Sequence, residues 1–292
     1  MGRKINVSLF AFCIFLILSI IFYYPIILGK VPLNGSLLVS LWPPLNFLKW
    51  TDFPAGVPFK FMGVDEVREF YPLLDFTYDS FRSGIIPLWN PYNFSGYSHI
   101  GNVASAVFYP MHLAMLILSK PWVLIVLKLS ASILAGFFTY IYLRSLKLSV
   151  ISSYFGGIAF GFSATLQIWN AEIWQSAHSF LWLPLALFSI ESLIQKQKIQ
   201  FSILFGFSIA MSIMAGYIQP TIYLLIIIIL YTIFRILLGK KKNMGMIFKL
   251  VFGFLLGFGI SAVQLLPAIE AYLLSPRSQV SLIDLNKSFL LP

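Results

Sequence analysis

Long apolar runs are the feature that most restricts how this chain can fold. A transmembrane helix needs roughly 20 apolar residues, because the hydrocarbon core of a bilayer is about 30 Å thick. Seven runs approach or exceed this length. We predict membrane spans at about 7–28, 122–143, 150–168, 177–194, 201–217, 219–238 and 247–266. The sequence therefore predicts an all-α polytopic membrane protein, with residues 1–292 forming a single membrane domain.

The composition excludes the other broad classes. Hydrophobic residues make up 59% of the 292 residues and charged residues 10%, whereas a soluble domain has about 45–50% and about 25%. The net charge of +10 comes largely from Lys and Arg that flank the apolar runs. This pattern is typical of membrane topology, so we expect no nucleic-acid partner. Cys13 is the only cysteine, which excludes an internal disulfide.

The distribution of Lys and Arg predicts which side each loop faces. Basic residues at 196–198 and 240–242 lie in short loops, which the positive-inside rule places in the cytoplasm. Counting back along the spans, the basic residues at 144–147 and at the N-terminus also fall inside. We therefore predict a multi-pass protein of the plasma membrane with a cytoplasmic N-terminus, and a long external loop at 29–121.

Two shorter apolar stretches within this loop affect the count of spans. Residues 36–48 contain Pro43 and Pro44, and residues 103–119 contain Pro110. If one stretch alone crossed the membrane, one end of the protein would violate the positive-inside rule, whereas both ends obey it if both stretches cross or neither does. Two crossings would require two short helices broken by proline. We favour neither crossing and interpret 103–119 as an interfacial or re-entrant helix.

Nearly all of the acidic residues fall on the predicted external side. Of the ten acidic residues, Glu191 alone lies near a cytoplasmic helix end. Because Asp and Glu contribute little to topology, membrane insertion does not explain this asymmetry. It suggests chemistry or cation contact at the outer face. The nine external acids are Asp52, Asp65, Glu66, Glu69, Asp75, Asp79, Glu172, Glu270 and Asp284.

The external loop at 29–121 is too long to be a simple connector, and it is rich in Phe, Trp, Tyr and Pro. Residues 63–72 place three acids and an arginine beside aromatic side chains. Residues 73–82 have the periodicity of an amphipathic helix, which we expect to lie along the membrane surface. Its apolar face carries Leu74, Tyr78 and Phe81, and its polar face carries Asp75, Asp79 and Arg82.

Short blocks rich in aromatic residues, Pro and Gly occur at 63–72, 87–96, 105–110, 143–148, 182–184, 216–223 and 262–277. In this order they resemble the YfhO-type family of bacterial polytopic membrane proteins, which are regarded as class C (GT-C) glycosyltransferases. The resemblance implies a GT-C-like fold and a sugar taken from a polyprenyl-phosphate carrier. It also leaves open that the chain is an N-terminal fragment, because family members usually run longer.

The resemblance implies that Asp65 is the catalytic acid of the first loop. A carboxylate there can deprotonate or orient an acceptor hydroxyl, while cationic or metal groups neutralise the phosphate that leaves. A divalent cation held by Asp65, Glu66 and Glu69 is one reading, although the metal itself stays unknown. The expected substrate-binding residues are Glu66, Arg68, Glu69, His178, Gln219 and Arg277.

Plainer interpretations also exist. Asp65 fits an exposed loop acid or a helix cap, and Arg277 fits a solvated residue that follows a span. Glu66 and Glu69 fit a solvated acidic face, and His178 fits a hydrogen-bonded residue at the membrane interface. Gln219, like Gln264, lies in or beside an apolar span and is expected to face the bundle interior. Lys128 lies one or two turns into the second span, where its side chain can reach the membrane surface.

Three functions follow from these observations. The first is a glycosyltransferase that moves a sugar from a polyprenyl-phosphate carrier to a cell-envelope acceptor, such as a teichoic-acid-like polymer, at the outer face of the lipid bilayer. The second is a transporter or flippase of a lipid-linked sugar, which would need more charge at mid-span than Lys128 supplies. The third is a non-catalytic membrane assembly protein.

Overall fold

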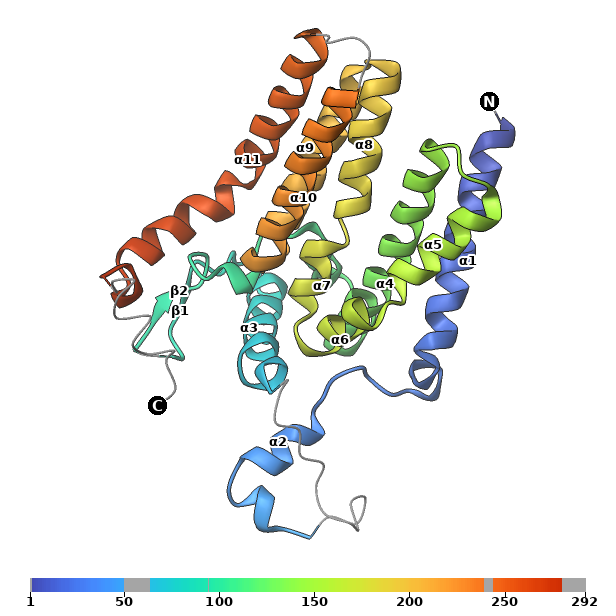
Figure 1. Ribbon diagram of the computed structural model, residues 1–292. Helices are drawn as coiled ribbons and strands as arrows, with labels where there is room; N and C mark the ends of the chain where they lie inside the picture. Colours follow the sequence, from blue (N-terminus) through green and yellow to red (C-terminus); the bar gives the residue numbers. More distant parts are fainter. Residues whose placement is uncertain (1, 50–63, 94, 239–243, 280–292) are drawn as a thin grey trace, which may run out of the picture.

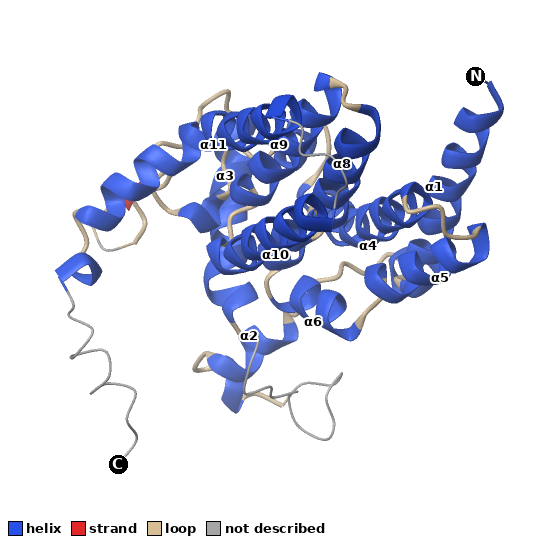
Figure 2. Cartoon of the chain, turned by 45° about the horizontal axis from the view of Figure 1, so that its top comes forward, coloured by secondary structure: helices blue, strands red, loops and turns tan. Residues whose placement is uncertain are grey.

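Helices account for nearly all of the regular structure in the computed structural model of the protein (Figures 1 and 2). The structure describes residues 2–49, 64–93, 95–238 and 244–279. The long helices are α1 (Gly2–Phe22), α4 (Lys120–Ser145), α8 (Leu183–Lys196), α9 (Ile199–Met214), α10 (Ile218–Leu238) and α11 (Met244–Leu273). The shorter ones are α2 (Ser36–Leu41), α3 (Tyr71–Arg82), α5 (Val150–Gly161), α6 (Ala164–Glu172) and α7 (Trp174–Phe180).

Short 3₁₀-helices and one π-helix join these elements. The 3₁₀ segments are η1 (Tyr24–Leu28), η2 (Leu45–Phe47), η4 (Val103–Ser105), η5 (Pro110–Leu116) and η6 (Pro276–Gln279), and the π-helix is η3 (Glu66–Phe70). A small antiparallel hairpin pairs β1 (Trp89–Asn90) with β2 (Tyr97–Ser98), so that Trp89 faces Ser98 in the register.

Four segments of the described chain are long and apolar enough to cross a membrane. They are Lys120–Ser145, Trp174–Lys196, Ile218–Leu238 and Met244–Leu273, and two shorter apolar helices cover Ser8–Phe22 and Ile199–Met214. Each of these six segments overlaps a predicted span. The prediction of an all-α membrane protein is therefore confirmed.

The predicted span at 150–168 is wrong as a single helix. The chain forms α5 up to Gly161 and starts again as α6 at Ala164. Ser163 breaks the helix, because its backbone is extended (φ −60°, ψ 146°) and its hydroxyl accepts a hydrogen bond from the Leu166 amide at 3.2 Å. This is an N-cap, which begins a new helix rather than continuing the old one.

The centre of the bundle is formed by α4 and the α7–α8 segment. In the most apolar part of α7–α8, 78% of the residues are buried inside the protein. The corresponding value for α10 is 17%, so α10 lies at the periphery of the bundle. Leu127, Ile190 and Ile209 are fully buried in the main core. On the other side, α1 packs on α4 through Phe15, which belongs to a second, smaller cluster.

Glycines allow α9 and α11 to approach closely. A Cβ atom added to Gly206 would lie 2.5 Å from the Gly253 carbonyl oxygen, and one added to Gly257 would lie 2.8 Å from the Gly206 carbonyl oxygen. Such distances are far inside van der Waals contact, so only glycine fits at this crossing. The sequence favours close packing at Gly253, Gly257 and Gly259, and the structure bears this out for the first two only, because Gly259 faces open space.

The amphipathic helix predicted at 73–82 is present as α3, but its apolar face does not point into lipid. Leu74 is buried in the main core, and Tyr78 and Phe81 pack against that core. On the polar face, Asp75 and Asp79 contact the Lys120 ammonium at 2.5 and 2.9 Å. The helix is therefore held by the protein itself, which the pattern of apolar residues alone cannot distinguish from a membrane surface.

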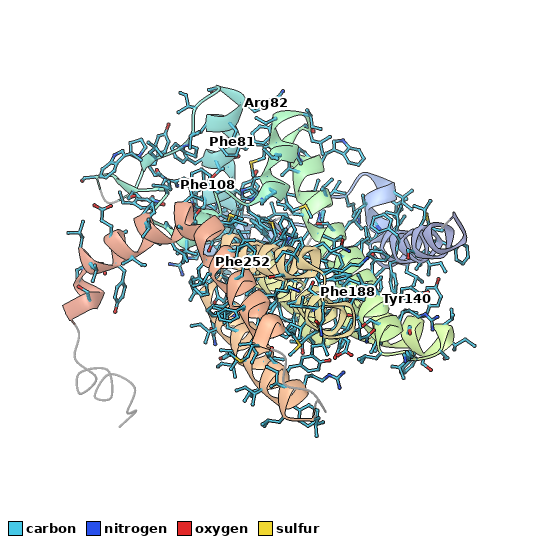
Figure 3. All side chains as sticks on the ribbon, turned by 90° about the horizontal axis from the view of Figure 1, so that it is seen from above. Phe81, Arg82, Phe108, Tyr140, Phe188 and Phe252 are labelled. Carbon is cyan, nitrogen blue, oxygen red and sulfur yellow. The ribbon has the colours of Figure 1, made fainter. Side chains whose placement is uncertain are left out.

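The stretch at 103–119 is likewise not a regular α-helix. It folds as η4 and η5, with Tyr109 and Met115 buried in the core between them and α4. Phe108 lies beside α3 at the same edge of the bundle as Phe81 and Arg82, as the view from above shows (Figure 3). This edge contains a groove that is described below.

Candidate functional site

Asp65 and Glu66 are adjacent in the sequence but lie in opposite environments. Asp65 precedes the first turn of η3 and is exposed, and its carboxylate makes no hydrogen bond or ion pair with another described residue. The Glu66 side chain is 2% exposed. A π-helical turn widens the backbone and is frequent at functional sites. Consecutive side chains on a helical turn point about 100° apart, so one acid faces outward and the next faces into the protein.

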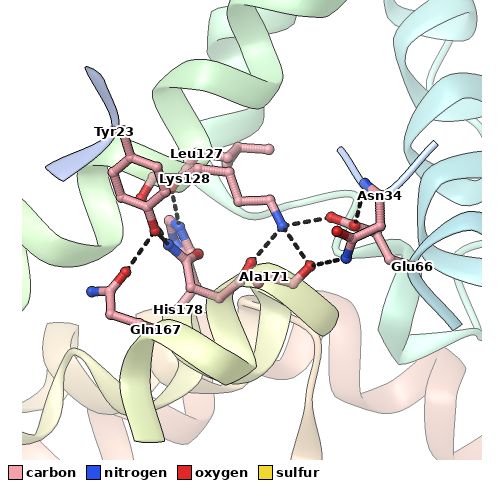
Figure 4. A network of polar contacts seen from close by, with 9 residues as sticks. Tyr23, Asn34, Glu66, Leu127, Lys128, Gln167, Ala171 and His178 are labelled. Carbon is pink, nitrogen blue, oxygen red and sulfur yellow. Dashed lines mark hydrogen bonds and ion pairs between the residues drawn. The ribbon is translucent and has the colours of Figure 1, made fainter. Parts of the chain in front are cut away.

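The Glu66 carboxylate is paired with Lys128 of α4 inside the bundle (Figure 4). The Lys128 ammonium lies 2.5 Å from Glu66 Oε1 and also donates to the carbonyl oxygens of Asn170 and of Ala171, the latter at 3.2 Å. These three contacts use all three donors of the ammonium. The two carbonyls belong to the last turn of α6, where the helix dipole favours a positive charge.

Further hydrogen bonds extend this pair into a network. Glu66 Oε2 accepts a hydrogen bond from the Asn34 amide at 3.1 Å, and the Asn34 side chain donates to the Ala171 carbonyl at 3.2 Å. The Asn170 side chain donates to the Tyr23 hydroxyl at 2.9 Å, which in turn donates to Gln167 at 2.6 Å. The network therefore joins the end of α1, the first loop, α4 and α6 (Figure 4).

The expectation that Lys128 reaches the membrane surface is wrong. Its side chain is 1% exposed and ion-paired. An ionisable residue within an apolar span normally needs a partner inside the protein, and this rule indicates that such a partner exists. It does not identify Glu66, which lies 62 positions away in the sequence.

His178 is a member of α7 and is fully buried. Its Nε2 atom donates to the Leu127 carbonyl oxygen at 2.8 Å, so its Nδ1 atom accepts from the Tyr109 hydroxyl at 2.9 Å. The Trp182 indole donates to the same hydroxyl at 3.3 Å. Both ring nitrogens are thus engaged within the protein. The structure places His178 as a buried connection between α7, α4 and the first loop.

The exposed part of the site combines carboxylates with aromatic rings. Arg68 and Glu69 are exposed on η3, near Asp65. Tyr217 lies close enough to Asp65 and Glu69 to interact with both charges. Its ring packs against Phe70 and Trp169, with centroids 6.4 Å apart in each case.

Gln219 and Gln264 lie in different environments. Gln219 is exposed at the start of α10 and donates to the Tyr223 hydroxyl at 2.8 Å, so the expectation that it faces the bundle interior is wrong. Gln264, by contrast, is buried and donates to the Ile100 carbonyl at 2.7 Å. Arg277 belongs to η6, but its side chain lies outside the described part of the structure, as do Asp52 and Asp284.

Asp65, Glu66 and Glu69 do not form a metal site in the described part of the structure. No group of three or more His, Cys, Asp or Glu side chains among the described residues is placed to hold a metal ion. Glu66 in particular is occupied by Lys128. The divalent cation expected for Asp65, Glu66 and Glu69 therefore does not fit these three residues as they stand.

An open apolar groove lies at the edge of the bundle shown in Figure 3. It has a volume of about 400 Å³ and runs between the end of α3 and η5. Ile86, Phe108 and Leu113 are among its lining residues. The buried side chains of Tyr109 and His112 form part of its wall, so the groove borders the residues that hold His178.

The model of a family described as bacterial membrane protein YfhO matches residues 102–290. The matched segment includes Lys128, Asn170 and His178 but begins after Asp65 and Glu66. No curated protein and no solved structure matches the chain.

Proposed function

Since the chain belongs to the YfhO family of bacterial membrane proteins, we propose that it is a glycosyltransferase that takes a sugar from a polyprenyl-phosphate carrier. The acceptor is a hydroxyl of a cell-envelope glycopolymer. In this reaction the acceptor oxygen forms a bond to the anomeric carbon, the bond from that carbon to the phosphate oxygen breaks, and polyprenyl phosphate leaves. The acceptor proton passes to a carboxylate.

The observation that carries the proposal is the contrast between Asp65 and Glu66. A general base must be ionised and reachable by the acceptor. The exposed carboxylate of Asp65 has no partner among the described residues, whereas the Glu66 carboxylate is buried and bound to Lys128. We therefore assign the base to Asp65 and leave Glu66 out of substrate binding.

The surroundings of Asp65 supply the other groups that the reaction needs. Arg68 is an exposed cation that can contact the phosphate of the carrier. Glu69 and the rings of Tyr217 and Trp169 are available to the sugar. The apolar groove near Phe108 lies farther away, at the opposite end of α3 from Asp65, where it can hold a more distant part of the polyprenyl chain. Gln219 and Arg277 remain further candidates for substrate contact.

The proposal places this site on the outer side of the plasma membrane. We retain a cytoplasmic N-terminus and an external loop at 29–121. Figure 1 supports this arrangement, because the N-terminus and the α4–α5 and α8–α9 connections lie at one end of the bundle, while α3 and α6 lie at the other. The basic residues of those connections are thus separated from the acids of the first loop.

The test is sugar transfer by an Asp65→Asn variant. Membranes from cells that lack the native gene are given radiolabelled sugars linked to polyprenyl phosphate, one at a time beginning with glucose, and label in the envelope polymer is measured. We expect Asp65→Asn to lose most of the transfer, by roughly 100-fold or more. Asp79→Asn is the matched control, since Asp79 is also an exposed first-loop acid but pairs with Lys120.

Three other outcomes would count against parts of the proposal. Full transfer by Asp65→Asn would show that Asp65 is not the base. Movement of the labelled lipid across the membrane without transfer would favour a flippase. If neither transfer nor movement occurs with the wild-type chain, a non-catalytic assembly role is favoured.

A further inference from the structure

We propose that Lys128 is a positioning residue, which sets the orientation of Asp65 through the carboxylate of Glu66. The inference rests on the proposed function, because it takes Asp65 as the base. Lys128 does not touch the exposed face of the site. It acts from inside the bundle, on the residue next to Asp65 in the chain.

Hydrogen bonds restrict the orientation of both Lys128 and Glu66. The Lys128 ammonium is fixed from three sides by Glu66 Oε1 and by the carbonyls of Asn170 and Ala171. Glu66 is itself fixed through both oxygens, because Oε2 accepts from the Asn34 amide. A side chain bound through both oxygens has little freedom to rotate, so the backbone at 65–66 is held in one orientation.

Apolar contacts alone would hold the same turn less specifically. Val67 and Phe70 are buried on the inner side of η3. Such contacts keep the turn against the bundle but do not fix its orientation, because the hydrophobic effect is not directional. Orientation matters here, since a displacement of about one ångström in a reacting group can lower the rate about 100-fold. The ion pair adds a directional link between η3 and α4, because it holds the Lys128 ammonium nitrogen 2.5 Å from Glu66 Oε1.

The consequence of losing Lys128 follows from the burial of Glu66. An ionised carboxylate at 2% exposure is strongly unfavourable without a partner, so Glu66 would move toward water or take up a proton. Either change alters η3. Asp65, one residue earlier, would move with it while the rest of the bundle stays packed.

The experiment compares Lys128→Met with Lys120→Met in the purified full-length chain in lipid nanodiscs. Lys120 is a matched control, since it lies on the same helix and its ion pairs also reach the first-loop helix, but at the surface. Hydrogen exchange is followed over residues 64–70. We expect it to accelerate by about tenfold or more in Lys128→Met and to stay near the wild-type rate in Lys120→Met.

The kinetic readout separates positioning from substrate binding. For transfer of glucose from polyprenyl phosphate, we expect Lys128→Met to lower kcat by about tenfold or more and to leave KM within about twofold. Lys120→Met should change neither value. A rise in KM with an unchanged kcat would overturn the inference, because it would mean that Lys128 acts on binding of the carrier.

A second variant covers the case in which Lys128→Met fails to fold. Glu66→Gln with Lys128→Met leaves no buried charge without a partner, so the bundle should fold. We expect α4 and α9 to exchange at the wild-type rate and 64–70 to exchange faster. Wild-type exchange at 64–70 in this double variant would overturn the inference. If the wild-type chain transfers none of the polyprenyl-phosphate sugars tested, the proposed function fails, and the exchange data alone decide whether Lys128 holds Asp65.

Discussion

The Tyr109 hydroxyl lies 2.9 Å from Nδ1 of His178, and both side chains are almost completely buried. Tyr109 belongs to the first loop and His178 to α7, so this contact joins the loop to the centre of the bundle. The direction of the hydrogen bond is fixed, because Nε2 of the same ring donates to the Leu127 carbonyl. His178 is therefore a structural link in this fold.

Removal of this hydroxyl should destabilise the protein measurably. Tyr109→Phe leaves His178 Nδ1 and the Trp182 indole without their partner, and an unsatisfied buried polar group costs about 1–3 kcal/mol. Thermal unfolding in detergent measures the effect. Tyr223→Phe is the control, since Tyr223 is exposed and only accepts from Gln219. Equal melting temperatures for the two variants would contradict this role of Tyr109.

The α9–α11 crossing should not tolerate a methyl group. Gly206→Ala would place a Cβ atom 2.5 Å from a backbone carbonyl, which cannot move aside easily. We expect a loss of about 1–3 kcal/mol of stability, as for other overpacked interiors. Gly259→Ala on the same α11 meets nothing within 4 Å, and should be neutral or stabilise by up to about 1 kcal/mol. Denaturation of both variants in the same detergent compares them directly.

His99 should make the stability depend on pH. Burial lowers the pKa of His99 to about 4 from its ordinary 6.5, so the unfolded chain takes up a proton on this ring at higher pH than the folded protein does. The stability that the neutral ring gives is complete above about pH 6.5 and is lost as the pH falls toward 4. Thr77, which hydrogen-bonds the ring at 2.9 Å, cannot compensate a positive charge.

The measurement is the melting temperature of wild type and His99→Gln between pH 7 and pH 4.5. Carboxylates titrate in both proteins, so the difference between the two slopes reports His99. We expect the wild-type melting temperature to fall more steeply on acidification. Parallel slopes would show that His99 is protonated equally in the folded and unfolded states.

The topology makes a separate prediction about labelling. In a Cys13→Ser background, cysteines are introduced at Arg68 and at Lys147, which are both exposed but belong to opposite ends of the bundle. A membrane-impermeant maleimide applied to intact cells should modify position 68 and leave position 147 unmodified until the cells are permeabilised. Modification of position 147 alone in intact cells would reverse the proposed orientation.

The sequence by itself determined the class of the fold and several of its local features. Apolar runs of membrane length predict the helices, because burial of the backbone in lipid requires helical hydrogen bonding. The amphipathic spacing of Leu74, Tyr78 and Phe81 predicts α3, and the glycines at 253 and 257 predict a close helix crossing. All of these follow from spacing along one segment.

Only the tertiary structure decided which side chains meet. Hydropathy does not specify which helices are neighbours or how each is rotated, so the pairing of Glu66 with Lys128 was not accessible from spacing. For the same reason, adjacent acids that look alike in the sequence divide into an exposed Asp65 and a buried Glu66. The break at Ser163 also depended on a backbone conformation that the overall hydropathy of the run does not show.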